Sequence, residues 1–110
     1  MTLKKVIFLG NSLQRIRAFP FSARQDAGFQ IDSVQRGESP DDWKPINSVG
    51  KGVREIRIKH ASNQYRVIYL AKKYNAIYVL HAFQKKTRKT LKSDIELARK
   101  RLNQIGHQNE

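Results

Sequence analysis

Apolar residues recur with changing periods along the first third of the chain. The β-branched and aromatic run at 4–9 predicts a short strand. Apolar residues three apart predict a brief helix over 12–18, which a Phe-Pro step breaks. Steps of four, four and three then predict a second helix that starts at a capping-box pattern of Ser22 and Gln25 and ends at Gly37. Two helices joined by a tight break predict a helical hairpin.

The second half of the chain has the two-residue alternation typical of strands. Residues 38–52 are predicted to form a loop, and strands are predicted at 53–59, 64–73 and 76–86. A tight turn at Tyr74-Asn75 joins the last two strands. Because the connections are short, we expect an antiparallel meander.

The last segment is predicted to be a helix, because apolar residues recur at helical spacing from Leu91 to Ile105. Ser93 and Glu96 form a capping-box pattern near its start, and Gly106 is its predicted end. The predicted order is therefore β-α-α-β-β-β-α, an α+β fold. A chain of 110 residues is one domain's length, so we expect a single domain over 1–110.

Composition removes several kinds of chemistry. The chain has no cysteine, which excludes disulfides, thiolate metal sites and a cysteine nucleophile. Its three histidines cannot by themselves complete a tetrahedral zinc site. Paired carboxylates, a phosphate-binding glycine loop before a helix and an HExxH motif are all missing from the sequence. A conventional hydrolase is not expected, and the lack of a signal-peptide pattern predicts a cytoplasmic protein.

Net charge is concentrated in the second half of the chain. Residues 1–50 carry seven basic and five acidic side chains, a balance of +2, whereas residues 51–110 carry fifteen and four, a balance of +11. A segment with this charge attracts polyanions, and nucleic acid is the leading candidate. A basic surface that serves only solubility is the alternative. A membrane partner is not expected, because no apolar run approaches the roughly 20 residues that span a bilayer.

Many of these cations fall on the predicted sheet. Neighbouring strands lie about 5 Å apart, so their side chains can converge on one patch. Like charges placed together repel, and a sequence that accumulates them is expected to hold an anion. Ordinary solvated strand faces are the alternative. The residues concerned are Arg57, Lys59, Arg66, Lys85, Lys86 and Arg88.

A patch of this kind can cleave RNA without a metal. RNA carries its own nucleophile, the 2′-hydroxyl beside the scissile phosphate. Arginine and lysine can stabilise the charge of the transition state, and a lysine crowded by other cations can also transfer protons. His81 is the only histidine inside a predicted strand of this sheet, so it is the best single candidate for proton transfer. A structural role for His81 under the last helix is equally open.

Alternation along the third strand leaves the position of the site open. His81, Phe83 and Lys85 share one face of this strand, and Lys86 lies on the other. The two lysines can serve one site only if the strand frays or bulges there.

Five short segments follow one another along the chain, and their combination is more specific for a protein family than any one of them alone. They are Asp41-Asp42-Trp43-Lys44-Pro45, Gly52-Val53-Arg54-Glu55-Ile56-Arg57-Ile58, Tyr65-Arg66-Val67-Ile68-Tyr69, Val79-Leu80-His81-Ala82-Phe83-Gln84-Lys85-Lys86-Thr87 and Asp94-Ile95-Glu96-Leu97-Ala98-Arg99. Together they resemble the phage-derived, HigB-like branch of the RelE/ParE toxin superfamily. The likeness extends from about residue 5 to residue 104, and the combination is specific.

The resemblance implies a small twisted antiparallel β-sheet with an N-terminal helical hairpin and a C-terminal helix. It implies the toxin of a type II toxin–antitoxin system, a ribosome-dependent endoribonuclease that cuts mRNA and arrests translation with basic residues and no metal or other cofactor. It also implies a cognate antitoxin, expected to be a helix-turn-helix protein. Operator DNA would be contacted only through the toxin–antitoxin complex.

The resemblance also implies roles for individual residues. Arg66 matches a cation that contacts the scissile phosphate. Arg57 and Lys59 match basic residues of the preceding strand, and Lys85 and Lys86 match a basic pair at the end of the third strand. Some RelE members place a catalytic tyrosine after the third strand, but residues 87–95 contain none. Either His81 or a lysine does that work, or the activity is weaker or different. The expected catalytic residues are Arg66, Lys86, His81 and Arg57, and the expected RNA-binding residues are Lys59, Lys85, Arg88 and Arg54.

Two other functions stay open on the sequence. ParE-like relatives share the fold and poison DNA gyrase, so fold likeness alone does not fix the target. A simple nucleic-acid-binding module would bind RNA or DNA in a salt-sensitive way without toxicity.

Overall fold

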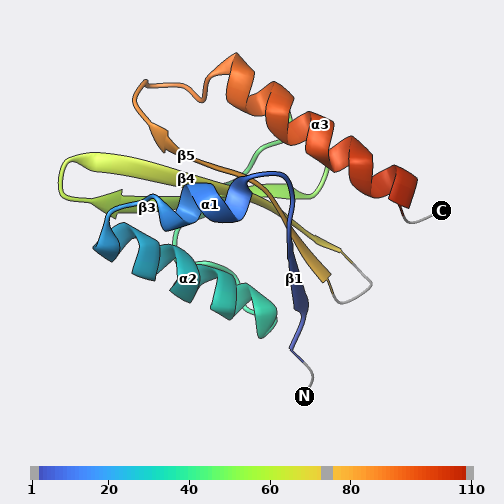
Figure 1. Ribbon diagram of the computed structural model, residues 1–110, viewed down its shortest axis with the longest axis horizontal. Helices are drawn as coiled ribbons and strands as arrows, with labels where there is room; N and C mark the ends of the chain where they lie inside the picture. The colour runs from blue at the N-terminus through green and yellow to red at the C-terminus, as the bar shows by residue number, and fades with distance from the viewer. Residues whose placement is uncertain (1–2, 73–75, 109–110) are drawn as a thin grey trace.

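The structure is a computed structural model that describes residues 3–72 and 76–108 (Figure 1). The α+β fold and the predicted order of elements are confirmed, with one additional short strand. The predicted turn at Tyr74-Asn75 lies outside the described residues. The elements are β1 (Lys5–Phe8), α1 (Ser12–Arg17), α2 (Phe21–Gln35), β2 (Trp43–Pro45), β3 (Val53–His60), β4 (Asn63–Lys72), β5 (Ala76–Lys85) and α3 (Lys92–Gln108).

The five strands form one sheet in the order β1-β5-β4-β3-β2. Strands β3, β4 and β5 make the predicted antiparallel meander, and β2 extends it by pairing antiparallel to β3. Strand β1 differs from the expectation of a wholly antiparallel sheet, because it pairs parallel to β5. The chain reaches this arrangement because α1 and α2 separate β1 from the meander, which then returns strand by strand to the β1 edge.

The additional strand, β2, lies in a segment predicted to be loop. Trp43, Lys44 and Pro45 pair with β3 at the edge of the sheet. Pro45 has no backbone N–H to donate, so it is tolerated in a strand only at such an edge. A three-residue edge strand that contains a proline gives no alternation signal, which is why the sequence did not predict it.

Helices cover both faces of the sheet, but they cover them unequally (Figure 1). Helices α1 and α2 pack on one face, and α3 packs on the other. On the hairpin side, Ala23 and Ala27 of α2 contact a buried apolar layer that includes Ile56, Ile58 and Val67. On the α3 side, the core is formed by residues such as Ala98 and Ile105 of α3 with Val53, Ile68 and Leu80 of the sheet.

A bulge in β5 changes which residues face α3. Val79 pairs with Tyr69, but the next residue of β4, Ile68, pairs with His81, so Leu80 is the extra residue. Leu80 and His81 therefore both lie on the α3 side, where strict alternation would have placed only one of them. The predicted set His81, Phe83 and Lys85 does share one face beyond the bulge.

The predicted helix ends are only partly correct. Gly37 follows the end of α2 with a φ of 85°, as its assignment as the stop predicts. The Ser22–Gln25 capping box is wrong, because α2 begins at Phe21 after Pro20 and its N-cap makes no side-chain hydrogen bond. Ser93 likewise lies inside α3, which begins at Lys92, and α3 continues past Gly106 to Gln108.

Arg101 fixes α3 to the start of the chain. Its guanidinium donates to the carbonyl of Leu80 at 2.8 Å and to the side-chain oxygen of Asn11 at 2.7 Å. Gly10, with a φ of 55°, makes room for this arginine, since a Cβ there would lie 2.5 Å from the guanidinium. In the part of the chain that the structure describes, no helix is long and apolar enough to cross a membrane.

Candidate phosphate-binding site

Four basic side chains line one hollow of about 280 Å³ on the α3 face of the sheet. Arg57 of β3 lies directly opposite Arg66 of β4, and Gln64 of β4 pairs with Lys59 on one side and Lys85 on the other. Residues opposite one another in a sheet point to the same face, so the register brings these cations together. We call Arg57, Lys59, Arg66 and Lys85 the cation cluster.

Arg66 is the most buried member of the cation cluster, with only 3% of the residue exposed. It donates from Nη1 to the carbonyl of Tyr65 at 3.0 Å and from Nη2 to Oε1 of Gln64 at 2.7 Å. Burial lowers the pKa of Arg66 most, and the charge of Arg57 lowers it further, while Glu55 opposes both. Arginine remains a cation at any physiological pH despite this shift.

Glu55 is a fully buried carboxylate beside the cation cluster. Its Oε1 lies 3.9 Å from Nε of Arg66, and its Oε2 accepts a hydrogen bond from the hydroxyl of Thr90 at 3.0 Å. Neither Oε1 of Glu55 nor Nε of Arg66 has a hydrogen-bond partner within residues 3–72 and 76–108. The sequence analysis did not select Glu55, although alternation in β3 puts it on the face of Arg57 and Lys59.

Lys85 and Arg57 complete the electrostatics of the hollow. Burial lowers the pKa of Lys85, and the neighbouring charge of Arg66 lowers it further. Arg57 lies 3.8 Å from a carboxylate oxygen of Asp42, which borders the same hollow and is half-exposed. The hollow is therefore strongly positive, with one exposed carboxylate at its rim.

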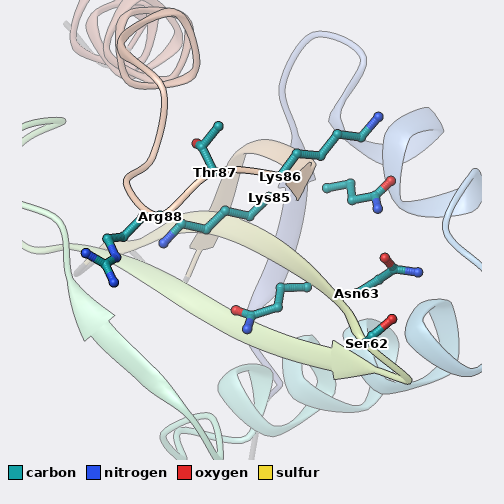
Figure 2. A pocket seen from close by; sticks show the side chains of 8 residues that line it. Ser62, Asn63, Lys85, Lys86, Thr87 and Arg88 are labelled. Carbon is teal, nitrogen blue, oxygen red and sulfur yellow. The ribbon is translucent and has the colours of Figure 1, made fainter.

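A second, larger hollow of about 660 Å³ adjoins the first and shares Gln64 and Lys85 with it. Figure 2 shows Lys85 extending toward Arg88, whereas Lys86 extends in the opposite direction. Lys86 therefore does not join the cation cluster, because β5 has no bulge at its end that would turn both lysines to one face. Lys86 and Arg88 line the larger hollow and not the first one.

His81 lies outside both hollows, beneath α3. It is 3% exposed, and its Nε2 lies 2.8 Å from Oδ1 of Asp94 in the first turn of α3. Burial lowers the pKa of His81 more than Asp94 raises it, and Arg101 and Arg15 lower it further. The structure therefore places His81 under α3 and outside both hollows, which fits the structural role that the sequence left open.

Arg54 also lies away from the cation cluster. Its guanidinium stacks over the ring of Trp43, 3.9 Å from the ring centroid. It borders a separate hollow with Lys4 and Tyr69, on the hairpin side of the sheet. Among the described residues, no group of three or more His, Cys, Asp or Glu side chains could hold a metal ion.

The order of the five strands, with α1 and α2 on one face of the sheet and α3 on the other, is the fold of small toxins of the RelE type. A solved structure of a double mutant of the E. coli toxin RelE in the free state matches this fold with a TM-score of 0.63. It shares 13% sequence identity, and the match covers 94% of this chain and 98% of that chain.

The model of the family described as phage-derived protein Gp49-like matches residues 14–103. The chain belongs to this family, and the predicted membership of the phage-derived part of the RelE superfamily is confirmed. A search of curated proteins gave no match.

Proposed function

We propose that this toxin is a ribosome-dependent endoribonuclease that cleaves mRNA without a metal ion. The observation that supports this proposal best is the convergence of four cations from three adjacent strands on one hollow. Four like charges at this spacing repel one another. A bound phosphodiester would offset this repulsion, and the more negative transition state of its cleavage would offset it further.

The reaction we propose uses the substrate's own nucleophile. The 2′-hydroxyl attacks the adjacent phosphorus and loses its proton, the bond to the 5′-oxygen breaks, and that oxygen takes up a proton. The products carry a 2′,3′-cyclic phosphate and a 5′-hydroxyl. Arg66 and Arg57 stabilise the extra negative charge on the phosphate oxygens, because guanidinium groups match those oxygens in geometry and stay charged.

Lys85 is the residue we propose for proton transfer. It lies in the cation cluster, and its lowered pKa brings a larger share of the amine into the neutral form that accepts a proton. His81 is less suited, because α3 covers it and its Nε2 is engaged with Asp94. Lys59, Lys86 and Arg88 are proposed to hold the RNA on either side of the reacting phosphate.

The proposed partners follow from the class of protein. A toxin of the RelE type is expected to have a cognate antitoxin that neutralises it. We propose that the antitoxin of this protein is a helix-turn-helix protein. We propose that the ribosome presents the mRNA in the bent form that the hollow accepts. The protein would contact operator DNA only through its antitoxin.

Mapping mRNA 5′ ends in cells after brief induction tests the proposal. We expect new 5′ ends inside translated regions with the wild-type protein and far fewer with Arg66→Lys, which keeps a cation beside Glu55 and so preserves the fold. Growth arrest with intact messages and DNA damage would instead identify a gyrase poison. Tight RNA binding without arrest or cleavage would identify a binding module.

A further inference from the structure

Arg66, the residue proposed to meet the phosphate most directly, is covered in this structure. Its side chain is only 4% exposed. Nη1 donates to a backbone carbonyl, Nη2 donates to Gln64, and Nε faces the carboxylate of Glu55. These bonds engage two of the five N–H hydrogens of the guanidinium and burial covers the others, so a phosphate oxygen reaches a donor of Arg66 only after a covering group moves.

Gln64 is the neighbour that can move most easily. The Tyr65 carbonyl belongs to the backbone of β4, and the carboxylate of Glu55 is fully buried and held by Thr90. Gln64 is exposed, so its side chain can turn into solvent and release its 2.7 Å bond to Nη2. An acceptor that enters from solvent would therefore replace Gln64 first.

The position of Gln64 is the one that a phosphate would need. In the register of the sheet it lies between Lys59 and Lys85, and its oxygen contacts Arg66. It also borders both hollows, so it stands between the cation cluster and the larger surface lined by Lys86 and Arg88.

We propose that Gln64 is a displaceable cap, whose carboxamide oxygen occupies the acceptor position that an RNA phosphate oxygen takes on Arg66. The proposal rests on the proposed function for the identity of the ligand. The bond from Arg66 to the cap satisfies a buried donor that would otherwise be costly to leave unpaired. A phosphate oxygen carries a negative charge and an amide oxygen does not, so phosphate adds an ion pair with Arg66 to the hydrogen bond, and the exchange favours the substrate.

The test compares RNA binding by three variants, with a short RNA that carries a 2′-deoxy sugar at the cleavage position so that it cannot be cut. Gln64→Ala should bind this RNA about three- to tenfold more tightly, since an ordinary hydrogen bond no longer has to be broken. Gln64→Glu should bind at least about tenfold more weakly, because its carboxylate forms an ion pair with Arg66 that RNA must displace. Fluorescence anisotropy at one fixed salt concentration measures both affinities.

Gln25→Glu is the matched control for charge. Gln25 is exposed on α2, which packs on the face of the sheet opposite the cation cluster, and it lines neither hollow. This variant adds the same negative charge away from the proposed RNA path and should change the affinity by about twofold or less. Weaker or unchanged binding by Gln64→Ala, or equal effects of Gln64→Glu and Gln25→Glu, would overturn the proposal.

Two further variants separate this proposal from the proposed function. If Lys85→Gln and Arg66→Lys both bind the RNA as tightly as the wild type, the cation cluster is not the phosphate site and both proposals fail. If these two variants bind more weakly while Gln64→Ala shows no gain, the phosphate site stands and only the cap is wrong. Thermal unfolding midpoints establish that each variant is folded.

Discussion

The two faces of the sheet use the same strands for opposite purposes. The face under α1 and α2 presents apolar side chains such as Ile58, Val67 and Val79, all fully buried. The other face is apolar only where α3 covers it, and beyond α3 it carries the cation cluster. One face therefore stabilises the fold, and the other divides its residues between stability and a charged hollow.

The difference arises within single strands. In β3, Ile56 and Ile58 face the hairpin, while Glu55 and Arg57 face the hollow. A sheet with two faces lets one strand contribute to the core and to the site in alternate residues. Substitutions on the two faces should therefore have separable effects, on the free energy of unfolding for one and on cleavage for the other.

The largest expected effect on stability is at Glu55, which is fully buried in the sheet and lies beside the cation cluster. Glu55→Ala removes the carboxylate beside Arg66 and leaves a buried cation unpaired, which costs about 3–5 kcal/mol in the free energy of unfolding. Chemical denaturation measures this change. A cost below about 1 kcal/mol would contradict the view that the pair matters to the fold.

Arg66→Lys should separate activity from stability most cleanly. It keeps a positive charge near Glu55 but loses the planar fork, so we expect cleavage to fall about 100-fold with little change in the unfolding midpoint. The measurement is the cleavage rate of ribosome-bound mRNA. Lys86→Ala is the comparison, since Lys86 lies outside the cation cluster and should affect cleavage less.

Acidification should destabilise the α3 side through His81. The pKa of His81 in the folded protein is below its ordinary value of 6.5, chiefly because of burial, so the unfolded chain binds the proton first. Stability is then lost as the pH falls below about 6.5, with a slope of at most about 1.4 kcal/mol per pH unit. Denaturation curves at several pH values should show this slope in the wild type and a shallower one in His81→Asn.

The smallest expected effect is on the hairpin face. Ile58→Val removes one buried methylene group and should cost about 1 kcal/mol in the free energy of unfolding. The cleavage rate per folded molecule should not change, because Ile58 lies on the face opposite the hollow. A large loss of activity at full folding would contradict the separation of the two faces.

The sequence predicted the elements that alternation and helical spacing define, and it assigned all four members of the cation cluster to one patch, together with Lys86 and Arg88. Arg57, Lys59, Arg66 and Lys85 lie on one face because strict alternation holds along those parts of the strands. Strict alternation fails at Leu80, the extra residue of the bulge, because the residues after it lie on the faces opposite to those that alternation predicts. No local feature of the sequence marks this bulge.

Other features depended on contacts between distant segments and could not be predicted. The bond from Thr90 to Glu55 joins residues 35 positions apart, and the bond from Arg101 to Asn11 joins residues 90 positions apart. The cover that Gln64 provides for Arg66 is local, but it depends on side-chain conformations that composition and spacing do not determine.

The most direct test of the account is the cleavage of ribosome-bound mRNA in which one nucleotide, at the mapped cut site, carries a 2′-deoxy sugar. If the cation cluster acts by aligning the substrate's own 2′-hydroxyl, cutting at that position should stop, and the all-ribose message should yield 5′-hydroxyl ends. Unchanged cutting of the 2′-deoxy message at the same position would contradict the account.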